Sequence, residues 1–92
     1  MMLPTIHLNG TDVKHLLEEI NEASDALRVA VEKLSVAGPN GRDYYPQGSA
    51  ALAQAQKEHS ERVRRLSDVR AELLEIIEYL LDQEYQREQG RA

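Results

Sequence analysis

Apolar residues recur at alternating intervals of three and four along two long stretches of this sequence. The first set is Val13, Leu16, Ile20, Ala23, Leu27, Ala30 and Leu34, flanked by Leu17 and Val31. The second set is Leu52, Ala55, His59, Arg62, Leu66, Val69, Leu73, Ile76 and Leu80, flanked by Val63, Ile77 and Leu81. Such spacing puts each set on one face of an α-helix and follows the heptad rule of helices that pack side by side. The pattern therefore predicts an all-α fold.

Turn-forming residues set the expected boundaries of these helices. Gly38 is expected to end the first helix in the left-handed conformation, and Pro39 cannot continue it. Thr11 and Ser49 are suitable N-cap residues. We expect a single helical-hairpin domain over residues 1–92, antiparallel and coiled-coil-like, with an extended arm (1–10), a first helix (11–37), a loop (38–49) and a second helix (50–88).

Composition narrows the functional classes. The chain has no cysteine, which excludes disulfides and thiolate metal sites, and no Phe or Trp, so its core depends on aliphatic residues. A formal net charge of −5 does not favour binding to long nucleic acid. No apolar run reaches the length of a membrane helix, and the N-terminus does not resemble a signal peptide, so a cytoplasmic location is expected.

The two predicted helices differ in length, and this predicts assembly. At 1.5 Å per residue they span about 35 and nearly 60 Å. Folding back symmetrically about the loop sets Val13 opposite Leu73, so that four apolar residues, Ile76, Ile77, Leu80 and Leu81, project beyond the first helix. Burying each is worth about 1.5–3 kcal/mol, so we expect both the arm (through Leu3, Ile6 and Leu8) and a second copy of the chain to cover them. The expected protein is a homo-oligomer.

The loop holds the first group of candidate ligand-binding residues. Arg42, Tyr44 and Tyr45 combine a guanidinium with two aromatic faces, which suits an anionic, nucleotide-like ligand. The alternative is that the tyrosines close the end of the hairpin and have only a packing role.

The second group lies in the next helix and comprises His59, Arg62 and Arg65. His59 and Arg62 interrupt the apolar set, so we expect both to point between the helices. A buried arginine needs an acid, such as Asp43 or Glu32, an anionic ligand, or water at a point where the helices splay apart. The alternative is an ion pair that fixes the register of the helices.

Other polar groups are weaker candidates. His15 and Glu19 have a spacing that can hold a metal, but a solvated pair is the simpler interpretation, and His7 is expected to help the arm pack. No nucleophile, phosphate-loop or zinc motif occurs, so we expect neither catalysis nor a cofactor.

Two segments carry a resemblance. TIHLNGT (residues 5–11) and PNGRDYYPQG (residues 39–48) resemble the signature of small uncharacterised bacteriophage and prophage proteins. The resemblance implies a phage context, in which small proteins of this shape are commonly virion or assembly accessories or counter-defence proteins. Some counter-defence proteins are helical oligomers that sequester cyclic or ADP-ribose-type nucleotides, a likeness of size and architecture only.

Two hypotheses follow. In the first, a non-enzymatic oligomer holds a small nucleotide-like anion, as a counter-defence sponge would, through the six residues of the two groups: Arg42, Tyr44, Tyr45, His59, Arg62 and Arg65. In the second, the chain is a structural or adaptor protein that binds other proteins through its helix faces and takes no small ligand. A pocket shared by Tyr44, Tyr45 and Arg62 would favour the first.

Overall fold

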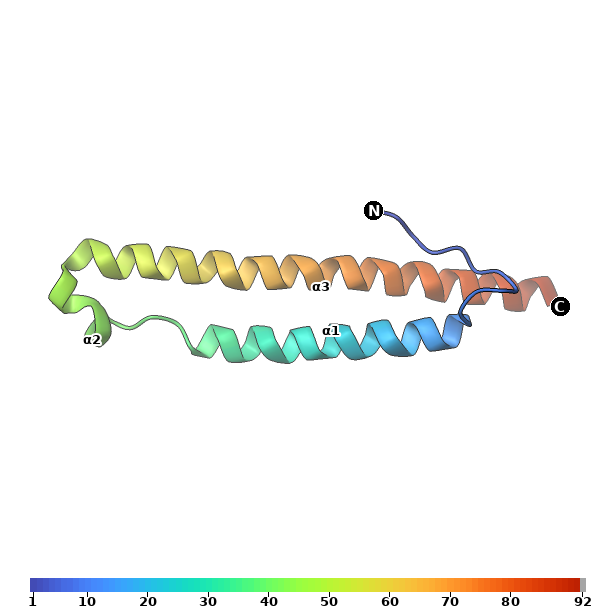
Figure 1. Ribbon diagram of the computed structural model, residues 1–92, viewed down its shortest axis with the longest axis horizontal. Helices are drawn as coiled ribbons and strands as arrows, with labels where there is room; N and C mark the ends of the chain where they lie inside the picture. Colours follow the sequence, from blue (N-terminus) through green and yellow to red (C-terminus); the bar gives the residue numbers. More distant parts are fainter. Residues whose placement is uncertain (92) are drawn as a thin grey trace.

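The computed structural model describes residues 1–91, with side chains for 1–90, and every regular element in that range is helical. The elements are α1 (Val13–Val36), the short α2 (Gly41–Tyr44), the 3₁₀ turn η1 (Tyr45–Gln47) and α3 (Ser49–Arg91). The predicted all-α class is confirmed. The shape is extended, with principal dimensions of 68 × 21 × 20 Å (Figure 1).

The two long helices lie side by side and run in opposite directions, and the connection between them has structure of its own (Figure 1). Where a loop was expected at 38–49, the Asn40 side chain accepts a hydrogen bond from the Arg42 amide at 3.0 Å and starts α2. Side-chain capping of this kind favours a helical turn. The segment continues through η1 to Gly48, which has a φ of 98° and precedes α3.

The helix ends differ from the predicted ones in detail. Asp12, not Thr11, occupies the N-cap position of α1, and Ser49 is the first residue of α3 instead of its cap. Gly38 does not take the left-handed conformation, because among the described residues only Gly48 has a positive φ. The last turn of α1 is instead satisfied by the Ala37 amide, which donates to the carbonyls of Lys33 and Leu34.

The contact between α1 and α3 uses a different set of residues from the predicted one. The residues of α1 that lose exposure include Val13, Leu17, Ile20, Ser24, Leu27, Val31 and Leu34. Those of α3 include His59, Val63, Leu66, Arg70, Leu73, Ile77 and Leu80. Both sets again alternate three and four. In each helix every second residue of the observed set is a predicted one. Each residue between them comes one position later in the sequence than the predicted residue. Leu16 and Ile76 are half-buried, whereas Ala23, Ala30, Arg62 and Val69 are exposed.

Ser24 and Arg70 explain part of this shift. Ser24 is only 3% exposed, and Arg70 reaches across from α3 to donate from Nε to the Ser24 carbonyl at 3.3 Å. A small residue on one helix opposite a long one on the other lets both pack in the same layer. The stem of Arg70 thus fills the position that the sequence pattern assigned to Val69.

The register of the two helices also differs from the predicted one. Val13 and Leu17 form one apolar cluster with Ile77 and Leu80, so Val13 does not face Leu73. The displacement amounts to about two helical turns at 3.6 residues per turn. It arises because the connection runs back along the first turns of α3, where Gly41 lies beside Leu52, instead of closing tightly.

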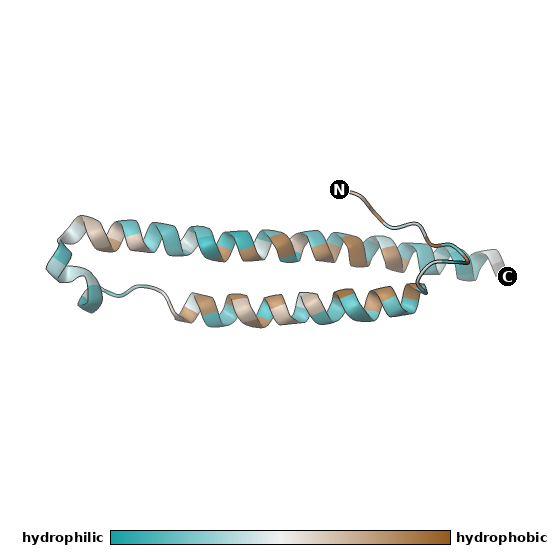
Figure 2. Ribbon diagram, viewed as in Figure 1, coloured by the Kyte–Doolittle hydropathy of each residue, from teal (hydrophilic) through white to brown (hydrophobic). Residues whose placement is uncertain are grey.

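This register buries most of the apolar end of α3 within one chain. Leu80 is fully buried and Ile77 is 9% exposed, while Leu81 remains 52% exposed. The prediction that all four residues project beyond the first helix is therefore wrong. Figure 2 shows the most apolar residues of α3 along the stretch that lies beside α1, and mainly hydrophilic residues toward its C-terminal end.

The N-terminal arm covers the same end of α3, as expected. Ile6 packs against the buried cluster, and the Tyr79 hydroxyl donates to the Pro4 carbonyl at 2.9 Å. Leu3 and Leu8, which were also expected to pack, are 39% and 99% exposed. The arm therefore contacts the core through its central residues only.

Candidate functional site

The tyrosines of the connecting segment differ in exposure. Tyr44 ends α2 and is half-buried, whereas Tyr45 begins η1 and is 78% exposed. Arg42 is exposed in the single turn of α2. Tyr45 and Arg42 are accessible to a partner or ligand, and Tyr44 contributes to packing at this end of the molecule.

His59 lies between the helices, as predicted. Its Nε2 atom is buried and has no hydrogen-bond partner among the described residues. The ring lies against Gly38, where an added Cβ would be 3.5 Å from the His59 Cδ2 atom. Buried polar atoms normally have a partner, so this nitrogen is the one unsatisfied side-chain group that the structure identifies.

Arg62 and Arg65 do not point between the helices. Both are exposed, and Val63 takes the position that the pattern assigned to Arg62. The acid nearest to Arg62 is Glu58, one turn earlier, with Nη2 and Oε1 3.9 Å apart. An exposed pair at this distance contributes little. The prediction of a buried arginine is wrong.

Neither predicted partner of Arg62 forms an ion pair with it in the described part of the chain. Glu32 accepts instead from Arg28 at 3.1 Å, within α1. Asp43 lies exposed in α2. The interhelical ion pair considered as an alternative is thus not present among the described residues.

The two groups of candidate residues are separated along the rod. Gly41 of α2 lies beside Leu52, whereas Arg62 is about 15 Å further along the axis of α3, at 1.5 Å per residue. A shared pocket of Tyr44, Tyr45 and Arg62 is not among the hollows found in the described surface.

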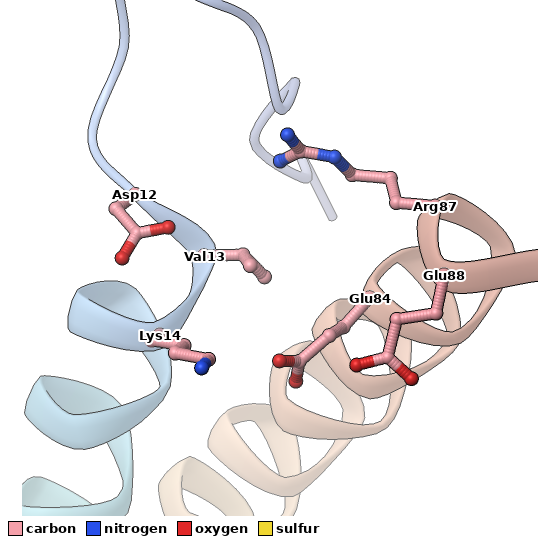
Figure 3. Close-up of a pocket in the computed structure, with 6 residues that line it drawn as sticks. All are labelled: Asp12, Val13, Lys14, Glu84, Arg87 and Glu88. Atoms are coloured by element: carbon pink, nitrogen blue, oxygen red, sulfur yellow. The ribbon is translucent and has the colours of Figure 1, made fainter. Parts of the chain in front are cut away.

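Three hollows occur elsewhere. The first, about 270 Å³, lies at the free end of the helix pair and is lined by Asp12, Val13, Lys14, Glu84, Arg87 and Glu88. Figure 3 shows Lys14 of α1 and Glu84 of α3 facing each other across it. Its three carboxylates outnumber its two cationic groups, so it does not suit an anion.

The second hollow, about 290 Å³, lies between α1 and α3 and is lined by Arg28, Val31, Glu32, Ser67, Arg70, Ala71 and Leu74. The third, about 350 Å³, is an open depression lined by Lys57, Ser60, Glu61 and Arg64. All six residues that the sequence proposed for a ligand site lie outside the linings of these hollows.

The remaining polar candidates are accounted for locally. His15 contacts Glu19 on the exposed surface of α1, as a solvated pair would. The His7 ring lies against Gly10, whose amide donates to the His7 carbonyl at 3.1 Å. Within the described residues no group of three or more His, Cys, Asp or Glu side chains could hold a metal ion. No described helix is long and apolar enough to cross a membrane.

Comparison with known proteins adds no relative. No family model, curated protein or solved structure matches this sequence. The function has to be argued from the arrangement of the side chains alone.

Sequence reasoning missed one surface feature. Leu74, Leu81 and Tyr85 are 43%, 52% and 57% exposed on α3, on the side that borders the second hollow. Leu74 and Tyr85 belong to neither the predicted apolar set nor its flanking residues. Their spacing to Leu81, of seven and four residues, was the signal in the sequence that could have identified this surface.

Proposed function

We propose that this chain is a non-enzymatic structural or adaptor protein: a coiled-coil-like helical hairpin that assembles with itself and acts by binding protein chains through its helix faces. In the phage context that the TIHLNGT and PNGRDYYPQG segments imply, this corresponds to a virion or assembly accessory that works in the host cytoplasm.

One observation carries this proposal. The rod leaves large apolar side chains exposed in succession along α3 (Leu74, Leu81 and Tyr85), although the molecule buries few residues completely. Exposed apolar patches on small proteins are typical of protein-binding surfaces. A rod 68 Å long with such a face suits contact with other helices better than enclosure of a small molecule.

The test combines the assembly state with a search for ligands. Sedimentation velocity over a range of concentrations is expected to show reversible association beyond the single chain. Thermal unfolding with a panel of cyclic and ADP-ribose-type nucleotides is expected to show no stabilisation, because linkage raises stability only when a ligand binds the folded state. A chain that stays single at every concentration would contradict the proposal.

A second candidate function is the binding of a nucleotide-like anion, as a counter-defence sponge. The exposed Tyr45 ring and the unsatisfied Nε2 atom of His59 favour it, because a base can stack on the first and a polar group of a ligand can satisfy the second. A nucleotide that raises the melting temperature of the wild type but not of the Tyr45→Ala and Arg62→Ala variants would establish this function in place of the first.

A further inference from the structure

One side of α3 carries a second regular stripe, distinct from the stripe that packs on α1. Ser67, Ala71, Leu74, Leu81 and Tyr85 are separated by four, three, seven and four residues, so they share one helix face. We refer to these five residues as the α3 flank. The arm contacts other residues of this helix, Tyr79 among them, and α1 packs on its seam. The α3 flank has small residues at one end and exposed large ones at the other, and Glu78, between Leu74 and Leu81, lies on the same face.

The α3 flank borders the 290 Å³ hollow between the helices. Val31, Ala71 and Leu74 supply apolar walls, and Arg28 with Glu32 lines the side formed by α1. An apolar cavity of about 150 Å³ already holds a benzene-sized group, so this hollow can take an aliphatic side chain from outside. The surface therefore has both a ridge and a recess, as interfaces between packed helices do.

The charges beside this surface are complementary between the two helices. The hydrogen bond from Arg70 to Ser24 fixes the register of α1 against α3. From this register the residue of α3 that lies opposite each residue of α1 can be worked out. Lys14 then lies close to the level of Asp82. Arg28 and Glu32 lie close to the levels of Asp68 and Arg64. Within the described part of the chain no ion pair joins the members of these pairs, and Arg28 pairs instead with Glu32 of its own helix.

A two-fold axis parallel to the helices keeps every residue at its own level. It places α1 of one copy over α3 of the other. Each of the three oppositely charged pairs therefore forms twice across the interface. The same arrangement brings Glu18 near Glu78 and Asp25 near Asp68, two like-charged pairs against three opposite ones. Complementary charges of this kind fix the register and the choice of partner.

The face formed by α1 and α3 is large enough for a stable dimer interface. The face of α1, at 1.5 Å per residue, is about 36 Å long, and the rod is 21 Å wide, which gives roughly 750 Å² per copy. Stable interfaces bury about 800 Å² on each partner. A second copy of the same length covers this face without leaving Leu74 exposed.

We infer that the partner at the α3 flank is a second copy of this chain, related by a two-fold axis that runs along the rods, with the two Leu74 side chains closing the paired hollows. This inference rests on the proposed function and specifies its self-assembly. It differs from the assembly expected from the sequence, in which Ile76, Ile77, Leu80 and Leu81 were to meet the arm and the partner; of these four only Leu81 belongs to the α3 flank.

Sedimentation equilibrium of two matched variants tests the surface. Leu74 and Val69 are 43% and 44% exposed on different sides of α3. Leu74→Asp is expected to raise the dissociation constant of the dimer by about 100-fold, as loss of a central apolar contact does, and Val69→Asp by less than about threefold. Circular dichroism at low concentration confirms that both variants fold. Equal effects of the two substitutions would overturn the inference.

A charge exchange tests the orientation. Arg64→Glu places an acid level with Glu32 of the other copy and is expected to weaken association about tenfold. Adding Glu32→Arg to this variant is expected to restore association to within about threefold of the wild type. A double variant no better than Arg64→Glu would overturn the two-fold arrangement.

The outcomes separate the inference from the proposed function. A wild-type chain that is single at millimolar concentration contradicts both. If the wild type and Leu74→Asp associate equally strongly, the proposed structural role remains. Only the assignment of the dimer interface to the α3 flank is then overturned.

Discussion

Gly48 has the positive φ that the sequence pattern assigned to Gly38. Gly48 links η1 to α3 with a φ of 98° and a ψ of 163°. That region is essentially restricted to glycine, and strain there costs about 1–3 kcal/mol for other residues. Gly38 has a negative φ and matters for its small size beside His59.

Alanine at these two positions is expected to give opposite results. Gly48→Ala should lower the free energy of unfolding by about 1–2 kcal/mol, because its backbone conformation is unfavourable for any side chain. Gly38→Ala should change it by less than about 0.5 kcal/mol, because the new Cβ meets His59 Cδ2 at an ordinary 3.5 Å. Urea denaturation followed by circular dichroism measures both. A larger loss at Gly38 would indicate a left-handed glycine there after all.

Arg70, and not Arg62 as predicted, is the arginine of α3 that reaches across to α1. Arg70 is half-buried and donates to the Ser24 carbonyl, whereas Arg62 has a side chain that is 51% exposed. Arg70→Ala should destabilise the fold by about 1–2 kcal/mol through the lost hydrogen bond and the lost packing of the arginine stem. Arg62→Ala should cost less than about 0.5 kcal/mol. Equilibrium unfolding of the two variants distinguishes the observed contact between α1 and α3 from the predicted one. The predicted contact requires Arg62→Ala to be the more destabilising substitution.

At the scale of elements, the arm and the connection determine how the two long helices fit. The connection covers the first turns of α3, so α1 pairs with the remainder and buries Leu80. The arm then contacts the same apolar end through Ile6 and through the hydrogen bond from Tyr79 to Pro4. The contact of the arm was expected from the sequence, whereas no feature of the sequence indicated that the connection would shift α1 over this end of α3.

The contribution of the arm is measurable through its one side-chain hydrogen bond to α3. Tyr79→Phe keeps the ring and removes the donor to the Pro4 carbonyl, so it should cost about 0.5–1.5 kcal/mol. Tyr85→Phe is the matched control, since Tyr85 is 57% exposed and makes no side-chain hydrogen bond among the described residues. Limited proteolysis should also cut the arm faster in Tyr79→Phe. Identical stability and cleavage for both variants would show that the arm is not held in this way.

At the scale of the whole molecule, the shape decides what assembly can look like. The radius of gyration of the Cα atoms is 19.8 Å, against about 12 Å for a compact domain of this length. Few of the described residues are fully buried, and three exposed large apolar side chains, Leu74, Leu81 and Tyr85, share one face along α3. Side-by-side pairing covers that surface, whereas end-to-end pairing does not.

Small-angle scattering distinguishes these arrangements. A dimer with its axis along the rods should keep a maximum dimension near the 68 Å of the single chain while its mass doubles. An end-to-end dimer would nearly double that dimension. Scattering at concentrations above and below the association range, with Leu74→Asp as the single-chain reference, gives both values. A dimer much longer than one chain would rule out the two-fold axis proposed here.

The positions of the candidate ligand-binding residues were predicted only in part from the sequence. His59 was correctly placed between the helices, and Tyr45 and Arg42 in the connection. Arg62 was misplaced because its neighbour Val63 fits the same helical spacing, and a one-residue shift turns a side chain by about 100°. Whether any of the six residues binds a ligand stays a prediction.

By itself the sequence determined the all-α class and, to within a few residues, where the two long helices begin and end, because spacing, caps and glycine or proline breaks act locally. Only the tertiary structure decided which of two overlapping stripes forms the contact and at what register. Leu16 and Leu17 both fit the three-four rule, and the choice depends on what lies opposite: Ser24 has room for Arg70, and the folded connection displaces α1 along α3. Those contacts join residues far apart in the chain, and no local pattern encodes them.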